Sequence, residues 1–157
     1  MKSFIINPFE KFNKEWALVT SGKKESFNSM TISWGTIGTL WHKSIVIIFV
    51  RPDRYTFKFL KDCDTFTVSF YDEKYRNELS LFGRTSGKDV DKVKESGFTP
   101  VFLDNSITYK EANQTIVLKK IYMEQMDKTK YNEDALKCYK ENDPAHYMII
   151  GQVLDIL

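Results

Sequence analysis

The run IVIIFV, from Ile45 to Val50, is apolar at every position and rich in β-branched residues. Such a run, ended by Arg51 and Pro52, fits a strand buried on both faces better than a short helix. We therefore expect this segment to lie deep in a core. A fold that contains such a strand has to supply neighbouring strands and apolar cover on both of its faces.

The rest of the chain predicts further strands and a few short helices. Strands are expected at residues 16–21, 28–34, 65–70, 115–126 and 147–157, and helices at 55–61, 75–82 and 90–95. The strands follow one another in hairpin-like succession with helices inserted, which predicts a mainly β antiparallel barrel instead of βαβ units. With 157 residues, 42% of them hydrophobic, the chain fits one domain spanning residues 1–157.

Charge and cysteine content exclude several classes of protein. The 23 basic and 21 acidic side chains are spread along the chain, so no basic stripe indicates nucleic-acid binding. The apolar patch near the N-terminus is too short for a signal peptide, and no run is long enough to cross a bilayer, so we expect a cytoplasmic protein without membrane contact. Cys63 and Cys138 form no CxxC pair and are expected to be reduced thiols, with no disulfide and no zinc site.

The stretch NSMTISWG, from Asn28 to Gly35, alternates like a strand but has unusually short polar side chains. Met30, Ile32 and Trp34 fall on one face, while Ser29, Thr31 and Ser33 fall on the other. The outward face of a half-buried strand usually carries longer, charged side chains. Short hydrogen-bonding groups leave the backbone open to close approach, so this strand is a candidate for contact with a flat or anionic ligand.

The segment VRPDRYT, from Val50 to Thr56, is predicted where the buried strand ends and a helix begins. A helix N-terminus stabilises an anion, and Arg51, Arg54 and the Thr56 hydroxyl add donors, so a phosphate site is one interpretation. In the alternative, Thr56 only caps the helix and the arginines pair with nearby carboxylates, at Asp53, Asp62 or Asp64. The segment alone leaves both open.

The loop SGKD, residues 86–89, offers a second set of donors. Ser86 supplies a hydroxyl, Gly87 a permissive backbone and Lys88 a cation. The loop lacks the spacing of a nucleotide P-loop, and no GxGxxG follows a strand, so standard ATP and Rossmann sites are not indicated. The alternative is a simple turn in which Asp89 starts the next helix.

The chain has two histidines, and neither has a partner at metal-ligand spacing. His42 is expected to be exposed in a turn. His146 directly precedes the last strand, where it could face a cleft and contact a substrate or donate a proton, or be merely structural. The absence of a GxSxG motif gives no support to hydrolysis.

Several segments, taken in order, carry a family resemblance: NSMTISWGTIGTLW, IVIIFVRPDRYTFKFL, TFTVSFY, LFGRTSGKDVDK with GFTPVF, and EANQTIVLKKIY. Together they resemble the flavin reductase-like family, the FMN-binding split barrels of flavoredoxin type, from about residue 16 to residue 153. The resemblance implies a mainly β fold with inserted helices, an FMN-binding split β-barrel that is usually a homodimer.

The resemblance also implies a set of FMN-binding residues. The strand at 28–34 would lie along the ring and ribityl chain, with the Thr31 and Ser33 hydroxyls donating to the ring's polar edge. The later segments would reach the phosphate and close over it. The implied set is Asn28, Ser29, Met30, Thr31, Ile32, Ser33, Trp34, Val50, Arg51, Tyr55, Thr56, Ser86, Gly87 and Lys88. His146 and Tyr147 match a position near the exposed face of the flavin, where a nicotinamide can stack.

The implied activity is that of an oxidoreductase with no catalytic side chain, because the flavin performs the chemistry. A hydride would pass from NADH or NADPH to FMN, and the electrons then to a free flavin, a ferric complex or a redox partner. Two alternatives stay open. The protein could be an FMN electron carrier without a nicotinamide site, or a split barrel that binds another planar cofactor such as haem through His146 or His42.

Overall fold

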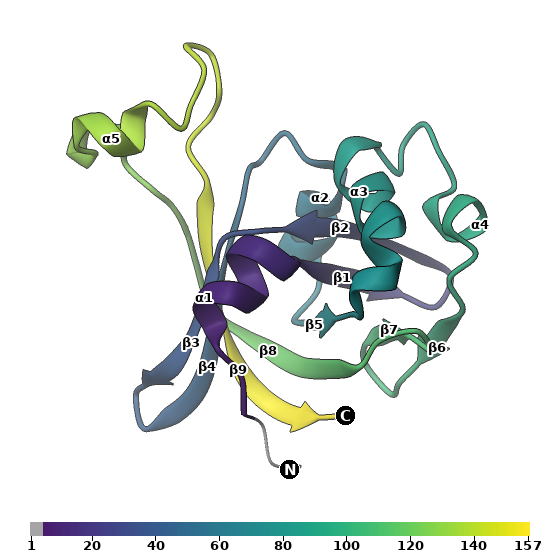
Figure 1. Cartoon of the computed structure of the whole chain (residues 1–157). Helices are drawn as coiled ribbons and strands as arrows, with labels where there is room; N and C mark the ends of the chain where they lie inside the picture. The colour runs from purple at the N-terminus through teal and green to yellow at the C-terminus, as the bar shows by residue number, and fades with distance from the viewer. Residues whose placement is uncertain (1–4) are drawn as a thin grey trace.

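A computed structural model describes residues 5–157, and Figure 1 shows its course. Residues 1–4, part of the N-terminal apolar patch considered above, lie outside the described residues. The main sheet has seven strands, each antiparallel to its neighbours, in the order β2-β1-β5-β8-β9-β4-β3. Its strands are β1 (Ala17–Lys23), β2 (Ser26–Ile32), β3 (Gly35–Leu40), β4 (Lys43–Val50), β5 (Thr65–Phe70), β8 (Gln114–Gln125) and β9 (Tyr147–Ile156).

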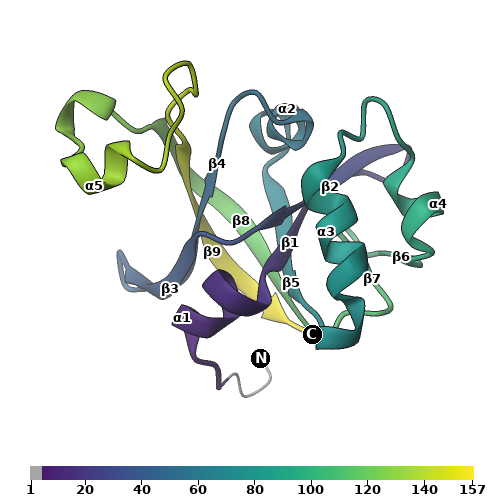
Figure 2. The same cartoon turned by 45° about the horizontal axis from the view of Figure 1, so that its top comes forward.

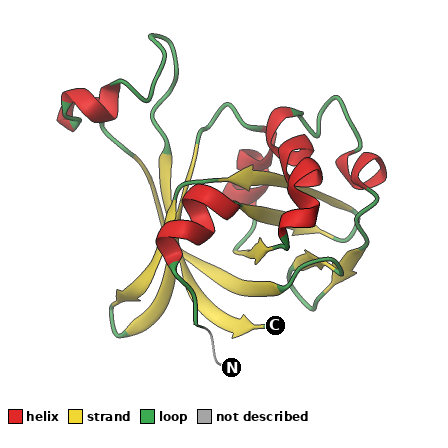
Figure 3. Cartoon of the chain, viewed as in Figure 1, coloured by secondary structure: helices red, strands yellow, loops and turns green. Residues whose placement is uncertain are grey.

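The helices are short and gather mainly beside β1 and β2, as Figure 3 shows for α2, α3 and α4. A separate hairpin is formed by β6 (Pro100–Phe102) and β7 (Ile107–Tyr109). The helical segments are α1 (Pro8–Glu10), η1 (Lys11–Glu15), α2 (Tyr55–Asp62), η2 (Glu73–Tyr75), α3 (Arg76–Arg84), α4 (Lys92–Ser96), η3 (Lys128–Lys130) and α5 (Glu133–Leu136). The predicted mainly β fold with inserted helices is confirmed.

The apolar run in β4 occupies an interior strand, between β9 and β3. Val46, Ile48 and Val50 have no exposed surface and belong to the main core. On the opposite face Ile45 is buried, whereas Ile47 and Phe49 are only half-buried. The prediction of a strand covered on both faces therefore holds fully for one face and partly for the other.

The main core fills the space between the curved sheet and the N-terminal segment. Phe12, from η1, is buried and meets Phe70 of β5 edge to face, with ring centroids 5.6 Å apart. A Cβ added to Gly35 would lie 2.6 Å from the Phe12 ring, so a glycine is needed where this ring crosses the start of β3. The N-terminal helical segment, which the sequence analysis did not predict, thus packs into the barrel.

A second core lies beneath α3 and joins it to the β6–β7 hairpin. Its buried members are Leu18, Tyr71, Leu79, Phe82, Phe98 and Tyr109. The polar face of β5 is also buried here, and its groups are hydrogen-bonded: the Thr67 hydroxyl donates to the Ile107 carbonyl oxygen of the hairpin at 2.6 Å. The sheet is therefore covered on two sides near β1 and β5.

Residues 126–146, between β8 and β9, form an arm that carries η3 and α5. Figures 1 and 2 both show the arm projecting beyond the end of the sheet. Arg51, just after β4, joins its base through an ion pair to Asp143 at 3.0 Å. In the described part of the chain, no helix is long and apolar enough to cross a membrane.

Candidate functional site

Two adjoining cavities form a groove beside the end of β4 and the start of α2. The aromatic pocket has a volume of about 250 Å³ and the cationic pocket about 210 Å³. Met30, Arg51 and Arg54 line both, so the two pockets adjoin. The aromatic pocket is further lined by Thr31, Ile32, Ser33, Trp34, Phe49, Gly83, Cys138 and His146, and the cationic pocket by Asn28, Asp53, Tyr55, Thr56, Arg84, Thr85, Ser86 and Lys92.

The cationic pocket concentrates positive charge in a protein whose net charge is only +2. Arg51, Arg54, Arg84 and Lys92 line it, against one carboxylate from the described residues, Asp53. Guanidinium groups present several donors in a fixed plane that matches phosphate oxygens. This pocket is therefore suited to an anion, and a phosphate group fits its donors.

Two of the predicted residues are bonded to each other at the floor of the cationic pocket. The buried Asn28 amide donates to the Thr56 hydroxyl oxygen at 2.8 Å, which links β2 to α2. Thr56 lies inside the first turn of α2, whose N-cap is Arg54, so it is not the cap that one interpretation expected. The Arg54 side chain makes no capping hydrogen bond within the described residues, and the Phe57 N–H donates to the Arg54 carbonyl oxygen at 2.9 Å. The N–H groups of Tyr55 and Thr56 are therefore the ones that could bind an anion here.

The two arginines of VRPDRYT behave differently. Arg51 pairs with Asp53 through Nε at 3.2 Å, as the surface ion-pair interpretation expected, and also with Asp143. Arg54 instead donates from Nη2 to the Gly83 carbonyl oxygen at 2.5 Å, which joins α2 to the end of α3. The ion-pair interpretation therefore holds for Arg51 and not for Arg54, and the phosphate site stays a prediction. A bound anion would have to share Arg51 with its carboxylate partners.

Lys92 was not among the predicted site residues, although it stands at the centre of the site. Its side chain is buried, and Nζ donates to the carbonyl oxygens of Ser29 at 2.9 Å and Phe82 at 2.8 Å. Burial, together with the nearby Arg54 charge, lowers the pKa of Lys92 to about 8. Lysine is rarely buried without a charged partner, so an anion in the cationic pocket would complete its environment.

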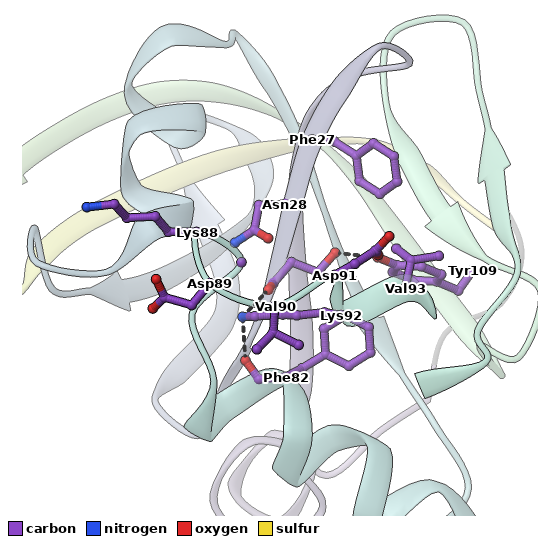
Figure 4. Close-up of a pocket in the computed structure, with 12 residues that line it drawn as sticks. Phe27, Asn28, Phe82, Lys88, Asp89, Val90, Asp91, Lys92, Val93 and Tyr109 are labelled. Carbon is purple, nitrogen blue, oxygen red and sulfur yellow. Dashed lines mark hydrogen bonds between the residues drawn. The ribbon is translucent and has the colours of Figure 1, made fainter. Parts of the chain in front are cut away.

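A third cavity, the loop pocket, shares Asn28 and Lys92 with the cationic pocket and is also lined by Gly87 and Lys88 of the loop (Figure 4). Its volume is about 290 Å³, and Ser29, Gly87, Lys88 and Tyr109 are among its lining residues. Figure 4 shows the Lys88 side chain directed away from Lys92 and Tyr109. A Cβ added to Gly87 would lie 2.7 Å from Asn28 Cγ, so the loop rests directly on Asn28.

The short polar side chains of β2 are used inside the protein. Ser29 Oγ lies 2.8 Å from both the Thr20 and Tyr109 hydroxyl oxygens. Thr31 donates its hydroxyl proton to the Leu79 carbonyl oxygen of α3 at 2.5 Å. Close packing of α3 and the hairpin therefore accounts for these small residues. Because its proton is already committed, Thr31 can accept but not donate a hydrogen bond to a ligand as it stands.

Trp34 and His146 line the aromatic pocket, and the Tyr139 ring packs against both of them. The His146 ring lies 4.8 Å from the half-exposed Trp34 ring, and its Nδ1 is 2.7 Å from the Tyr139 hydroxyl oxygen. Burial and the Arg51 charge lower the pKa of His146 to about 4, against a smaller opposing effect of nearby carboxylates. His146 is therefore neutral at pH 7. Its predicted place at a cleft agrees with the structure.

The structure separates the predicted residues into three groups. Asn28, Met30, Thr31, Ile32, Ser33, Trp34, Arg51, Tyr55, Thr56 and Ser86 line the groove, and Ser29, Gly87 and Lys88 line the loop pocket. Val50 is different: it lines none of these three pockets, and its side chain is fully buried in the main core.

The groove also contains residues that the sequence analysis did not select. Phe49, Arg84, Thr85, Lys92 and Cys138 line it. Arg84 and Thr85 belong to the glycine-rich loop already noted, so that loop was the available signal. Lys92 lies among exposed charges in the sequence, and no pattern there marks it as buried. Both cysteines are free, and the described residues contain no cluster of metal-binding side chains.

The donors and walls of the groove fit a ligand with an anionic tail and a planar, partly apolar body. Cations and a helix N-terminus stand at one end, and Trp34, Phe49 and Ile32 at the other. β2 is an edge strand of the main sheet, so its outer backbone groups are not paired within that sheet. Flavin mononucleotide has this combination of a phosphate tail and a ring with a polar edge.

The chain belongs to the flavin reductase-like family, because residues 9–124 match the flavin reductase like domain. The resemblance noted in the sequence is thereby confirmed, and the family is one of flavin-binding proteins. A comparison with curated protein sequences gives no significant match.

Solved structures of similar fold support the split-barrel architecture. Flavoredoxin from Methanosarcina acetivorans superposes with a TM-score of 0.72 at 16% identity, covering 100% of this chain and 75% of that chain. An FMN-binding protein from Thermus thermophilus with bound 1-cyclohex-2-enone gives 0.70 at 18%, covering 100% and 80%. The NADH:FAD oxidoreductase of Streptomyces globisporus C-1027, in complex with NAD and FAD fragments, gives 0.66 at 17%, covering 91% and 74%. At these identities the likeness shows the fold alone.

Proposed function

We propose that this chain is an FMN-dependent oxidoreductase of flavin reductase type, which takes electrons from NADH or NADPH and passes them to a free flavin, a ferric complex or a redox partner. The observation that carries the proposal is that the cationic pocket adjoins the aromatic pocket, with Met30, Arg51 and Arg54 lining both. The proposal includes a single domain over residues 1–157 and a cytoplasmic location.

In this proposal the cationic pocket holds the phosphate and the aromatic pocket holds the ring. Arg54, Arg84, Lys92 and the first turn of α2 supply charge and N–H donors to the phosphate, while Arg51 is shared with Asp143 of the arm. Residues 28–34 lie along the ring and ribityl chain. Gly87 and Lys88 do not contact the FMN in this proposal; their loop packs against Asn28 and holds that side chain in place.

The bound FMN supplies hydride and electron transfer, and the residues of this chain bind, orient and shield it. Trp34 and Phe49 provide apolar walls that limit the access of water. Backbone N–H groups on the open side of β2 can hydrogen-bond the polar edge of the ring, where negative charge develops on reduction. His146, which is neutral and lines the aromatic pocket, contacts the nicotinamide substrate.

The absorption spectrum of the purified protein tests the proposal. We expect a yellow protein, or a colourless one that binds added FMN, with a flavin spectrum that NADH or NADPH bleaches under anaerobic conditions. A flavin spectrum that neither nucleotide bleaches would identify an electron carrier without a nicotinamide site. A Soret band, or failure to bind FMN, would reject the proposed cofactor.

A homodimer is also part of the proposal. The outer face of β4 carries the half-buried Ile47 and Phe49, and Leu154 of β9 is half-exposed. Apolar surface of this kind on an interior strand is suited to cover by a second copy. Light scattering coupled to gel filtration should give twice the 18.4 kDa mass of the chain, whereas the mass of one chain would contradict a stable dimer.

A further inference from the structure

The contact between Tyr139 and His146 is not explained by flavin binding. Tyr139 follows α5 in the arm, and His146 lies at the base of the arm, directly before β9. The Tyr139 hydroxyl oxygen is 2.7 Å from His146 Nδ1, and the two rings meet edge to face at 5.4 Å. Trp34 contacts both rings, at 4.8 Å for His146 and 6.3 Å for Tyr139. Tyr131 in turn contacts the Tyr139 ring. The orientation of the imidazole is therefore fixed by one hydrogen bond and by a cluster of rings that contact one another.

The protonation states decide the direction of this hydrogen bond. Burial keeps the pKa of His146 near 4, so the ring carries one proton at pH 7. Burial also raises the pKa of Tyr139 well above its ordinary value, so the phenol keeps its proton. Two side chains bear on this hydroxyl, His146 and Tyr131. The imidazole nitrogen is the more basic acceptor and lies 2.7 Å away, so we assign the hydrogen bond as a donation from Tyr139 to Nδ1 of His146. The proton of the imidazole is then left on Nε2.

The second ring nitrogen remains available to a ligand. Nε2 of His146 makes no hydrogen bond with any described residue, while His146 lines the aromatic pocket. A neutral N–H group donates well to a carbonyl oxygen and brings no charge into an apolar site. The charged groups that affect the pKa of His146 are Arg51, Asp53 and Asp143, and both aspartates are paired with Arg51.

We propose that Tyr139 is a positioning residue, which holds His146 as the Nε2–H tautomer so that the imidazole donates to the carboxamide oxygen of a reduced nicotinamide in the aromatic pocket. The assignment of the nicotinamide rests on the proposed function, whereas the role of Tyr139 towards His146 does not. Tyr139 acts through His146 and does not itself contact the substrate.

Nitrogen NMR of the full chain tests the tautomer without cofactor or substrate. With two histidines in the sequence, long-range ¹H–¹⁵N spectra contain two imidazoles, and His42→Gln assigns them. At pH 7 we expect His146 to show a protonated Nε2 and an accepting Nδ1. In Tyr139→Phe, which removes only the hydroxyl, the two nitrogens should move towards averaged shifts.

Tyr131→Phe is the matched control. Tyr131 lies in the same arm and touches the Tyr139 ring at 5.6 Å. Its buried hydroxyl makes no hydrogen bond within normal distance in residues 5–157, although it helps to raise the pKa of Tyr139. This variant should leave the His146 shifts unchanged. A wild-type His146 that is an Nδ1–H tautomer, or that averages both forms, would overturn the proposal. So would shifts that stay the same in Tyr139→Phe, provided that circular dichroism shows that variant folded.

Kinetics test the donor role separately. Loss of one neutral hydrogen bond is expected to raise the KM for NADH or NADPH by about 3- to 10-fold in Tyr139→Phe, with the Kd for FMN within about twofold of the wild type. Tyr131→Phe should change neither. An unchanged KM would overturn the donor role. If the wild type does not react with either nucleotide, the proposed function fails together with the donor role, and the NMR result still decides the role of Tyr139.

Discussion

Arg51 is the residue to which both interpretations of the segment 50–56 apply, the phosphate site and the surface ion pair. It pairs with Asp53 and Asp143, and it also lines both pockets. A charge-assisted hydrogen bond to phosphate contributes about 1.5–3 kcal/mol. We therefore expect Arg51→Ala to raise the Kd for FMN by about 10- to 100-fold while the apoprotein stays folded, as measured by flavin titration and circular dichroism.

Arg76→Ala is the control for that prediction. The Arg76 guanidinium lies 3.1 Å above the Trp16 ring and donates to the Lys14 carbonyl oxygen, away from the groove. Its loss should lower stability without changing the affinity for FMN. Equal FMN affinity in Arg51→Ala and wild type, or unfolding of Arg51→Ala, would assign Arg51 a purely structural role.

Gly87 gives a second prediction at this scale. An added Cβ would press on Asn28, which donates to Thr56 at the floor of the cationic pocket. We expect Gly87→Ala to weaken FMN binding by about 3- to 10-fold, the size of one disturbed hydrogen bond, and to lower the melting temperature only slightly, because the loop can shift. In Gly38→Ala the new Cβ would meet no described atom within 4 Å, so it serves as the control. Equal affinities for FMN would show that the loop does not support the site.

Individual residues of the site were predictable only where a polar side chain stood at the end of a clearly predicted strand or helix. Asn28, Thr56 and Ser86 carry polar groups at the ends of clear elements, and they line the groove. Lys92 could not be found, because its burial depends on α3 and β2 meeting over it. Val50 was selected as part of a segment, yet the alternation of β4 turns its side chain into the core.

At the scale of elements, strong periodicity located most strands and helices. β5 has the bounds that its alternation predicts, and α2 begins at Tyr55 as expected after Pro52. The predicted second helix of the loop region begins later, because Asp91 and not Asp89 caps α4. β3 was missed, since two glycines interrupt its pattern, and β6 and β7 were missed because each has three residues.

Gly151 of β9 tests how tightly the central strands pack. A Cβ at this position would lie 2.7 Å from Phe66 Cζ and 2.9 Å from Leu118 Cβ, both in fully buried side chains. Overpacking of this kind costs about 1–3 kcal/mol, so we expect Gly151→Ala to lower the free energy of unfolding by that amount in urea denaturation. The exposed Gly38→Ala should change it little. A loss below about 0.5 kcal/mol in Gly151→Ala, the usual limit for surface changes, would contradict the packing described here.

For the whole molecule, His146 makes stability depend on pH. Its pKa is about 4 in the folded chain and about 6.5 when unfolded, so the unfolded state binds more protons between these values. Stability is therefore complete above pH 6.5 and is lost as the pH falls towards 4. Because the ring is only half-buried, we expect this loss to be about 1–2 kcal/mol.

Urea unfolding at pH 7 and pH 4.5 measures this effect. The wild type should lose more stability between the two values than His146→Gln, in which the neighbouring Arg51, Asp53 and Asp143 are kept. Equal losses in the two proteins would show that His146 titrates normally in the folded state.

The place of β9 has a consequence for how the chain folds. The last strand in sequence lies between β8 and β4, pairing residues 45–50 with residues 147–152. Until it is in place, the sheet consists of two separate pieces, β2-β1-β5-β8 and β4-β3. During synthesis, the hydrogen bonds that join β4 to the rest of the main sheet therefore form only after β9 has emerged. Such contacts between distant parts of a sequence slow folding, so closure of the main sheet by β9 should be slower than formation of the local hairpins.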